Sequence, residues 1–148
     1  MKKIDLYTDG ACSGNPGIGG WGCVLLYAGV RKEFCGAVEN TTNNRMELLA
    51  VIEGLKKLKI ACEVDIYSDS AYVTNAFLQN WIGNWHKNGW KGSDKKDVKN
   101  KDMWIELLNL TNIHKVVWHK VKGHADNELN NRCDELATGA IKEFRKTI

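Results

Sequence analysis

Four acidic residues are candidates for chemistry because of where they stand in the sequence pattern. Asp9 and Asp69 each follow a short alternating apolar run typical of a β-strand, Glu47 opens an amphipathic helix, and Asp134 lies in a helical segment near the end. If they converged without basic neighbours, the carboxylates would repel one another, and some would stay protonated at neutral pH. A hard divalent cation such as Mg²⁺ resolves that repulsion, because it binds carboxylate oxygens and keeps waters or phosphate oxygens as its other ligands.

The chemistry that such a cluster supports is phosphodiester hydrolysis. Two divalent cations on a phosphodiester activate an attacking water and stabilise the leaving oxygen in an in-line displacement. None of the lysine, serine or cysteine residues in the motifs has the adjacent base that a covalent nucleophile requires. We therefore expect direct attack by water.

Each of the four acidic residues also has a purely structural explanation. The helix that carries Glu47 is expected to begin with Asn44 as its N-cap, and Glu47 would then close a capping box by reaching back to Asn44. Asp9 precedes a glycine and suits a turn, and Asp69 precedes a serine and suits a helix cap. Asp134 taken alone is a solvated helix residue. Only convergence would give the four a common role.

The hydrophobic pattern predicts the elements that would bring these residues together. The expected strands are 4–8, 21–27, 31–38, 63–68 and 113–121, and the expected helices are 44–58, 70–79, 101–110 and 127–144. Residues 10–20 contain five glycines and the only proline, and they are expected to form a turn. Hairpins joining the first three strands, then helices alternating with strands, predict an α/β fold. Its mixed five-stranded sheet has three antiparallel strands, then two parallel ones, with helices on both faces.

Length and composition indicate a single ordinary globular domain. A chain of 148 residues is expected to form one domain, 1–148, and its hydrophobic fraction of 43% suits a globular interior. The longest apolar run is far shorter than the roughly 20 residues that span a bilayer. Met1-Lys2-Lys3 is followed by a run that Asp5 interrupts, unlike a signal peptide. We expect a cytoplasmic protein that has no membrane association and works as a monomer.

The cysteines are an odd, scattered set of five without a Cys-x-x-Cys pair. This pattern argues against a disulfide framework and against a zinc knuckle. Cys23 and Cys35 fall within expected strands, and we interpret both as small core residues.

Positive charge is concentrated in one stretch. The net charge is only +3, yet residues 86–101 carry six lysines against two aspartates. Trp81, Trp85 and Trp90 lie in or beside this stretch, and we call residues 81–101 the lysine-rich segment. The lysines form either a nucleic-acid surface or a solubilising face, and the tryptophans either a base-stacking platform or a cluster that stiffens a helix. Trp104 and Trp118 occupy periodic apolar positions and are expected in the core.

Five motifs together resemble the motif set of bacterial type 1 ribonuclease H. They are Thr8-Asp9-Gly10, Thr42-Asn43-Asn44-Arg45-Met46-Glu47-Leu48, Ser68-Asp69-Ser70-Ala71-Tyr72-Val73, Val121-Lys122-Gly123-His124-Ala125 and Arg132-Cys133-Asp134-Glu135-Leu136-Ala137. Any one motif is weak, but the set is specific because it covers nearly the whole chain in the family's order and spacing. The resemblance implies a ribonuclease H-like fold and hydrolysis of the RNA strand of an RNA–DNA hybrid, leaving 5′-phosphate and 3′-hydroxyl ends.

The resemblance also assigns roles to residues. It implies that Asp9, Glu47, Asp69 and Asp134 hold two Mg²⁺ ions, with Asp9 shared and Mn²⁺ a possible substitute. It places His124 on a mobile loop, assisting proton transfer or product release. The implied substrate-binding residues are Cys12, Asn15, Thr42, Asn43, Asn44, Trp81, Trp85 and Lys87.

Among these implied contacts, Asn15 and Thr42 resemble a phosphate pocket for the DNA strand. Asn43 and Asn44 resemble amides that read the minor groove, where RNA displays its 2′-hydroxyls. The lysine-rich segment resembles a basic protrusion that grips the DNA strand. One departure is Ala71, where many relatives carry glutamine, which removes a minor-groove hydrogen bond.

Two other classes of protein compete with this interpretation. A binding module that holds hybrids without cutting them gains nothing from four acidic residues near a phosphate, so the intact carboxylates argue against it. A DNA-cutting nuclease or strand-transfer enzyme of the same fold could carry the same acidic cluster. The pair Asn43-Asn44 and the lysine-rich segment favour the enzyme directed at RNA.

Overall fold

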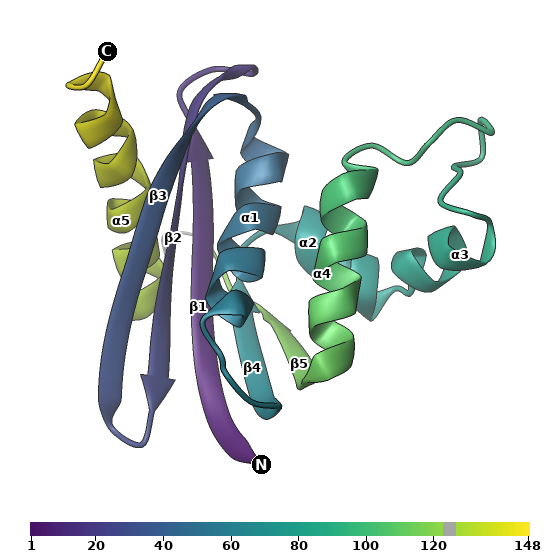
Figure 1. The fold of residues 1–148 in the computed structure, drawn as a ribbon, viewed down its shortest axis with the longest axis horizontal. Helices are drawn as coiled ribbons and strands as arrows, with labels where there is room; N and C mark the ends of the chain where they lie inside the picture. The colour runs from purple at the N-terminus through teal and green to yellow at the C-terminus, as the bar shows by residue number, and fades with distance from the viewer. Residues whose placement is uncertain (123–126) are drawn as a thin grey trace.

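The computed structural model describes residues 1–122 and 127–148 and contains a mixed five-stranded sheet (Figure 1). Its strands are β1 (Lys2–Cys12), β2 (Gly17–Tyr27), β3 (Val30–Thr41), β4 (Cys62–Ser68) and β5 (Lys115–Lys120). They lie in the order β3-β2-β1-β4-β5. The β1–β2 and β2–β3 pairs are antiparallel, and the β1–β4 and β4–β5 pairs are parallel. The predicted fold class is confirmed.

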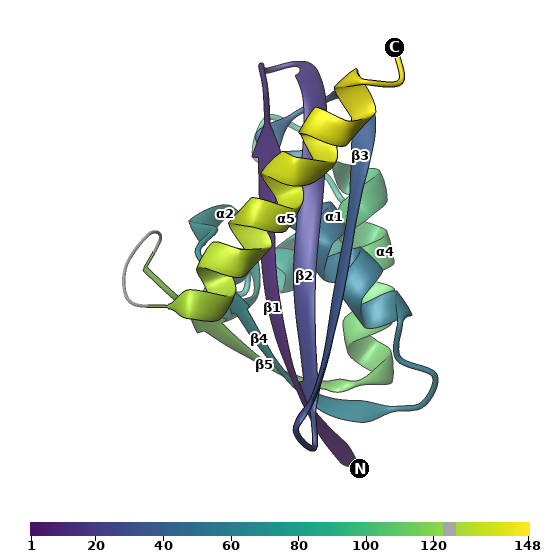
Figure 2. The same cartoon turned by 90° about the vertical axis from the view of Figure 1, so that its left-hand side faces the viewer.

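Helices cover both faces of the sheet. They are α1 (Asn43–Lys56), α2 (Ala71–Leu78), α3 (Trp81–Lys87), α4 (Lys101–Ile113) and α5 (Glu128–Arg145). Figure 2 shows α5 lying across β1, β2 and β3 on one face, with α1 and α4 behind the sheet on the other. Helix α3 and the residues after it extend away from the sheet, beyond α4 (Figure 1).

The main core lies between the sheet and α1, where the predicted alternation places apolar side chains on one face of each strand. Leu6 of β1 and Ile66 of β4 are fully buried there, as are Leu48 and Ile52 of α1. Burying an aliphatic side chain of this size contributes about 1.5–3 kcal/mol. Trp104 of α4 is also fully buried, as predicted. Among the helices that the structure describes, none is long and apolar enough to cross a bilayer.

The first two strands run further than predicted, into the stretch expected to be a turn. Only residues 13–16 connect β1 to β2. Helices rest on some glycines of these two strands: a side chain at Gly10 would overlap the backbone of α1, and one at Gly20 or Gly22 would overlap the backbone of α5. The glycine-rich pattern therefore marks close helix–sheet packing at these positions.

Helix α1 begins differently from the prediction. Its N-cap is Thr42, not Asn44, and the Thr42 hydroxyl accepts a hydrogen bond from the Arg45 backbone N–H at 3.3 Å. Asn44 falls within the first turn because the helix starts directly where β3 ends. The predicted capping box is wrong, since the Glu47 carboxylate bonds to Gly10 of β1 instead.

Smaller differences concern other boundaries and one cysteine. Helix α4 continues to Ile113, so β5 starts later than expected, and α3 forms inside the lysine-rich segment, between two of the expected helices. Cys23 is buried as predicted, whereas Cys35 is exposed because it lies on β3, an edge strand of the sheet. All five cysteines are free thiols. The N-cap of α2 is Ser70 and not Asp69, since the Ser70 hydroxyl accepts from the Val73 N–H.

Candidate active site

Three of the four predicted carboxylates meet at one site. One oxygen from each of Asp9, Glu47 and Asp69 lies within 4.8 Å of the other two. The parallel pairing of β1 and β4 explains the first and third, because Tyr7 pairs with Tyr67 and each aspartate follows two residues later. Glu47 reaches the same place from the first turns of α1.

Asp134 approaches this cluster from the opposite face of the sheet. It follows Cys133, whose carbonyl oxygen lies against Gly22, the register partner of Asp9. The negative charge of Asp134 contributes to raising the pKa of Asp9. Among the described residues, Asp134 stands outside the three-residue cluster, and the predicted His124 lies outside the described residues.

The backbone of Gly10 orients two of the carboxylates. Its N–H donates to Glu47 Oε1 at 2.6 Å and to Asp9 Oδ1 at 3.0 Å. Sequence reasoning missed this role, although the glycine directly after Asp9 was a signal for it. Gly10 must be a glycine because α1 rests on it, and the same contact brings Glu47 within reach.

Burial and mutual repulsion keep protons on this cluster when no cation is present. Burial, followed by the charges of Asp69 and Asp134, raises the pKa of Asp9 to about 7. Burial, followed by the charges of Asp9 and Asp69, raises the pKa of Glu47 well above its ordinary value. These donors are all oxygens, which fits a hard divalent cation. A bound cation would also stabilise the ionised forms of the carboxylates.

Comparison with known proteins identifies the family. The family model described as RNase H matches residues 1–142.

The chain belongs to the ribonuclease H family.

It is 63% identical to the ribonuclease H of Acetivibrio thermocellus over 146 residues, which cover 99% of each chain. It is also 63% identical to that of Thermoanaerobacter sp. strain X514, over 96% of this chain and 92% of the relative. Among solved structures, LC9-RNase H1, described as a type 1 RNase H with the type 2 active-site motif, superposes with a TM-score of 0.87. That match has 30% identity and covers 97% of this chain and 74% of the other. Ribonucleases H are metal-dependent nucleases that degrade RNA in RNA–DNA hybrids, so this chain is an enzyme of that class.

The predicted substrate-binding residues of this ribonuclease H fall into two groups, and the first lies around the start of α1. Asn43 and Asn44 are exposed in its first turn, next to the N-cap Thr42. The Cys12 thiol donates to the backbone carbonyl at the end of β3, at 3.4 Å, and Asn15 is exposed in the turn after β1. All five are therefore near the ends of β1 and β3, although their contacts with substrate stay predictions.

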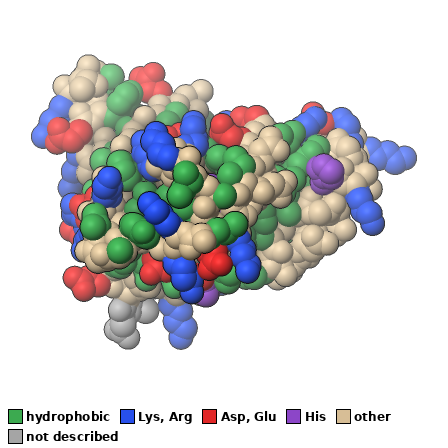
Figure 3. All heavy atoms as spheres, turned by 60° about the horizontal axis from the view of Figure 1, so that its bottom comes forward, with side chains coloured by type: hydrophobic (Ala, Val, Ile, Leu, Met, Phe, Trp, Pro, Cys, Tyr) green, Lys and Arg blue, Asp and Glu red, His purple; other side chains and the backbone are tan. Residues whose placement is uncertain are grey.

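The second group belongs to the lysine-rich segment. Trp85 packs against the buried Trp104, with ring centroids 5.3 Å apart, and Trp81 lies 6.4 Å from Trp85. Both tryptophans are partly buried against the core, as a cluster that stiffens α3 would be, while Lys87 is exposed. Basic side chains project from this end of the molecule, on the right in Figure 3. A base-stacking role for the tryptophans stays a prediction.

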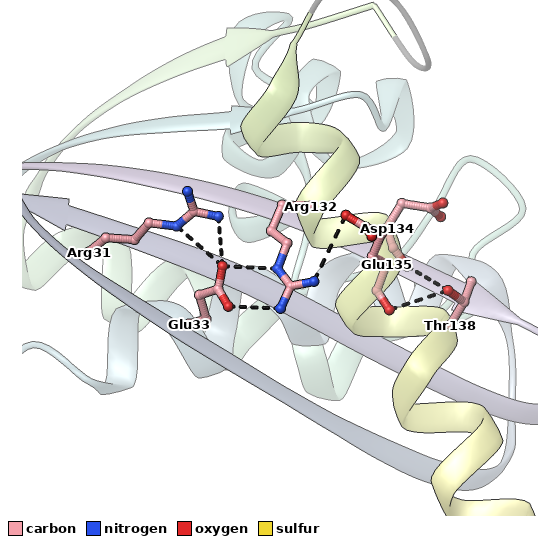
Figure 4. A network of polar contacts seen from close by, with 6 residues as sticks. All are labelled: Arg31, Glu33, Arg132, Asp134, Glu135 and Thr138. Carbon is pink, nitrogen blue, oxygen red and sulfur yellow. Dashed lines mark hydrogen bonds and ion pairs between the residues drawn. The ribbon is translucent and has the colours of Figure 1, made fainter.

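An ion-pair network that the sequence did not reveal attaches the part of α5 around Asp134 to β3. Arg132 of α5 donates to both carboxylate oxygens of Glu33 on β3 at 3.0 Å, and Arg31 donates to the same carboxylate at 2.7 Å (Figure 4). These arginines lower the pKa of Glu33 to about 2. The network holds the first turns of α5, and with them Asp134, against the edge strand.

Replacing Glu33 with glutamine should reveal the contribution of this network as a pH-dependent loss of stability. Because the pKa of Glu33 is lowered from its ordinary 4.5, its stabilisation is present above pH 4.5 and is lost as the pH falls toward 2. We expect Glu33→Gln to lose about 1 kcal/mol at pH 7, the upper range for exposed ion pairs, and progressively less in acid. Urea unfolding between pH 7 and 3 measures the difference.

The matched control for Glu33→Gln is Glu143→Gln, which removes the highly exposed ion pair with Lys146 near the C-terminus. That change should have no measurable effect at any pH. A loss in Glu33→Gln that stayed constant down to pH 3 would mean that packing, and not charge, accounts for it.

Proposed function

We propose that this ribonuclease H hydrolyses the RNA strand of RNA–DNA hybrids by in-line attack of water, with two Mg²⁺ ions, and leaves 5′-phosphate and 3′-hydroxyl ends. The observation that carries the proposal is the cluster of Asp9, Glu47 and Asp69, whose oxygens lie within 4.8 Å of one another in a largely buried setting. Family membership supports the hybrid as substrate.

We propose the following roles for the four carboxylates. Asp9, Glu47 and Asp69 would hold one cation, and Asp134 would join Asp9 at the second. When bound, the cations supply an activated water and stabilise the charge that develops on the leaving oxygen. The protein holds the carboxylates in place through the Gly10 N–H, so little reorganisation is needed on binding. From sequence alone, His124 is proposed to assist proton transfer or product release.

A cleavage assay on three matched substrates tests the function. We expect the RNA strand of a hybrid to be cut with Mg²⁺, whereas EDTA should stop the reaction and duplex RNA and duplex DNA of the same sequence should stay intact. Parallel reactions with Mn²⁺ determine the choice of metal, and end analysis of the products determines the ends. Hybrid binding without metal-dependent cleavage would indicate a binding module, and cutting of duplex DNA would indicate a DNA nuclease.

Neutralising part of the lysine-rich segment should weaken substrate binding more than it slows turnover. Lys87, Lys91, Lys95 and Lys96 are all exposed, and their replacement with glutamine should raise KM more than it lowers kcat. The salt dependence of hybrid binding should also become shallower, because each lost phosphate contact removes roughly 0.7–0.9 from the slope of log K against log salt. Binding titrations at several salt concentrations measure that slope.

A control variant with the same loss of charge uses exposed lysines outside this segment. They are Lys32, Lys56, Lys59 and Lys146. This variant should keep the wild-type slope. An unchanged slope in the first variant would mean that its lysines only solubilise the surface.

Three further proposals concern the setting of the enzyme. Its five free cysteines fit a reducing compartment such as the cytoplasm. We also propose that residues 1–148 act as one catalytic domain and that the protein is a monomer. Light scattering coupled to size-exclusion chromatography tests the oligomeric state.

A further inference from the structure

A cluster of hydrogen-bonded side chains joins three helices beside the candidate active site. Arg45 of α1 donates to Asn100 Oδ1 at 3.2 Å and forms a bidentate ion pair with Asp102 of α4, at 3.1 and 2.9 Å. Asn100 in turn donates to the Tyr72 hydroxyl of α2 at 3.0 Å, and Trp104 Nε1 donates to the same hydroxyl at 3.2 Å. We call these five residues the junction.

The side chain of Asn100 makes contacts between helices and does not cap its own helix. It occupies the N-cap position of α4 in the left-handed conformation, with φ of 63°. Asparagine is among the best N-cap residues, because its side-chain oxygen accepts from helix N–H groups. Here that oxygen accepts from Arg45, and the amide nitrogen donates to Tyr72. Both ends of the side chain are therefore used for contacts between helices.

Tyr72 is the member of the junction that lies on α2, the helix that follows Asp69. Its hydroxyl receives two N–H donors, which occupy both of its acceptor positions, and its ring lies 5.2 Å from the fully buried ring of Trp104. Tyr72 stands three residues after Asp69, in the first turn of α2. Its position is therefore fixed relative to both Asp69 and the core.

The junction lies between the two parts of the enzyme that the proposed function requires to act together. Arg45 stands two residues before Glu47 on α1, so one end of the junction is rigidly connected to the carboxylates. Asn100 stands at the end of the lysine-rich segment, where α4 begins, so the other end is connected to the basic side chains. The Trp85–Trp104 contact attaches α3 to the same point.

We propose that Arg45 and Tyr72 are positioning residues: through the junction they fix the lysine-rich segment relative to the carboxylates. The grip on one strand then determines which phosphate of the other strand reaches the metal site. This inference rests on the proposed function. Loss of the junction should change turnover and the place of cleavage while leaving hybrid affinity and metal affinity intact. A merely structural role would lower stability without moving the place of cleavage.

The first test removes a single hydroxyl, in Tyr72→Phe, with Tyr27→Phe as the matched control at the far end of the sheet. We expect Tyr72→Phe to lower kcat by about tenfold and to spread cleavage over neighbouring phosphates, since small misplacements of a bound substrate can cost roughly 100-fold. The Kd for hybrid in EDTA and the Kd for Mn²⁺ by calorimetry should stay within about twofold of wild type. Tyr27→Phe should leave all four quantities unchanged.

The second test exchanges the ion pair. Arg45→Asp and Asp102→Arg should each lower kcat, and the double variant, which restores an ion pair of reversed polarity, should recover a large part of the loss. If Arg45 instead contacted substrate directly through its charge, the double variant would stay as slow as Arg45→Asp, and the positioning role would be overturned. Exchanging Glu143 and Lys146, an exposed ion pair of α5 and its C-cap, should change nothing.

The outcomes separate this inference from the proposed function. A wild-type protein that cuts no hybrid overturns both. If the wild type cuts and Tyr72→Phe matches it in kcat and cleavage positions, with only a lower Tm, the junction is structural and the inference is wrong. A collapse of Mn²⁺ affinity in Tyr72→Phe would also overturn it, because the junction would then act on the metal site itself.

Discussion

Replacing Asp9 with asparagine is expected to abolish cleavage and leave the protein folded. Asp9 lies in the cluster with Glu47 and Asp69, and its Oδ1 accepts the Gly10 N–H. An amide oxygen can keep that hydrogen bond, but it cannot supply the charge that holds a divalent cation. Hybrid cleavage with Mg²⁺ should fall below detection, and calorimetry should show that Mn²⁺ affinity is lost.

The control for Asp9→Asn is Asp5→Asn, the same change on the same strand, at a partly exposed position outside the cluster. It should retain near-native turnover. Near-native turnover in Asp9→Asn itself would remove Asp9 from the catalytic site and with it the proposed mechanism.

Asp9→Asn should also change stability, in a direction opposite to that of Glu33→Gln. The pKa of Asp9 is raised to about 7, so the folded state holds a proton that the unfolded state has lost, and this group costs stability as the pH rises from about 4 to 7. In EDTA the variant should therefore be more stable than wild type by about 1–4 kcal/mol at pH 8, and nearly equal to it at pH 4. Mg²⁺ should stabilise only the wild type.

The fold was predictable because its pattern is local. Alternating apolar residues defined the strands, and the hairpins followed by alternating helices and strands defined the mixed sheet. The convergence of Asp9 and Asp69 followed from that topology, since each comes two residues after the last paired residue, Tyr7 or Tyr67, of neighbouring parallel strands. Glu47 could be assigned because its motif belongs to a set of five that is specific as a whole.

What the sequence did not reveal depends on contacts between distant segments. The glycines of β1 and β2 resemble a turn in sequence, and only packing against α1 and α5 shows why strand residues need them. The N-cap was misplaced because residues 40–44 all suit a cap, and the end of β3 determines which one is used. Arg45 and Asn100 are 55 residues apart, so no local pattern indicates the junction.

The 2′-hydroxyls of the substrate should control cleavage more strongly than binding. Asn43 and Asn44 are exposed in the first turn of α1, the helix that carries Glu47, so whatever they contact is held in a fixed position relative to the carboxylates. If they read 2′-hydroxyls in the minor groove, recognition and catalysis share one rigid helix, and a misread groove misplaces the scissile phosphate. A hybrid should therefore be cut on its RNA strand alone.

Replacing the ribonucleotides that flank the cut with deoxynucleotides should then raise the activation free energy of cleavage by about 1–3 kcal/mol per lost contact. The single-turnover rate should fall by roughly 5- to 150-fold for each contact. Hybrid binding through the lysine-rich segment should persist, because the contacts that we propose for that segment are with phosphates, which this replacement leaves in place. The variant Asn43→Ala/Asn44→Ala should be slow on the all-ribose strand and largely insensitive to the same deoxynucleotides, since the contacts that they remove are already absent. Equal penalties in wild type and variant would place the 2′-hydroxyl readout elsewhere. Equal cutting of hybrid and all-DNA substrates would show that the start of α1 does not distinguish RNA from DNA.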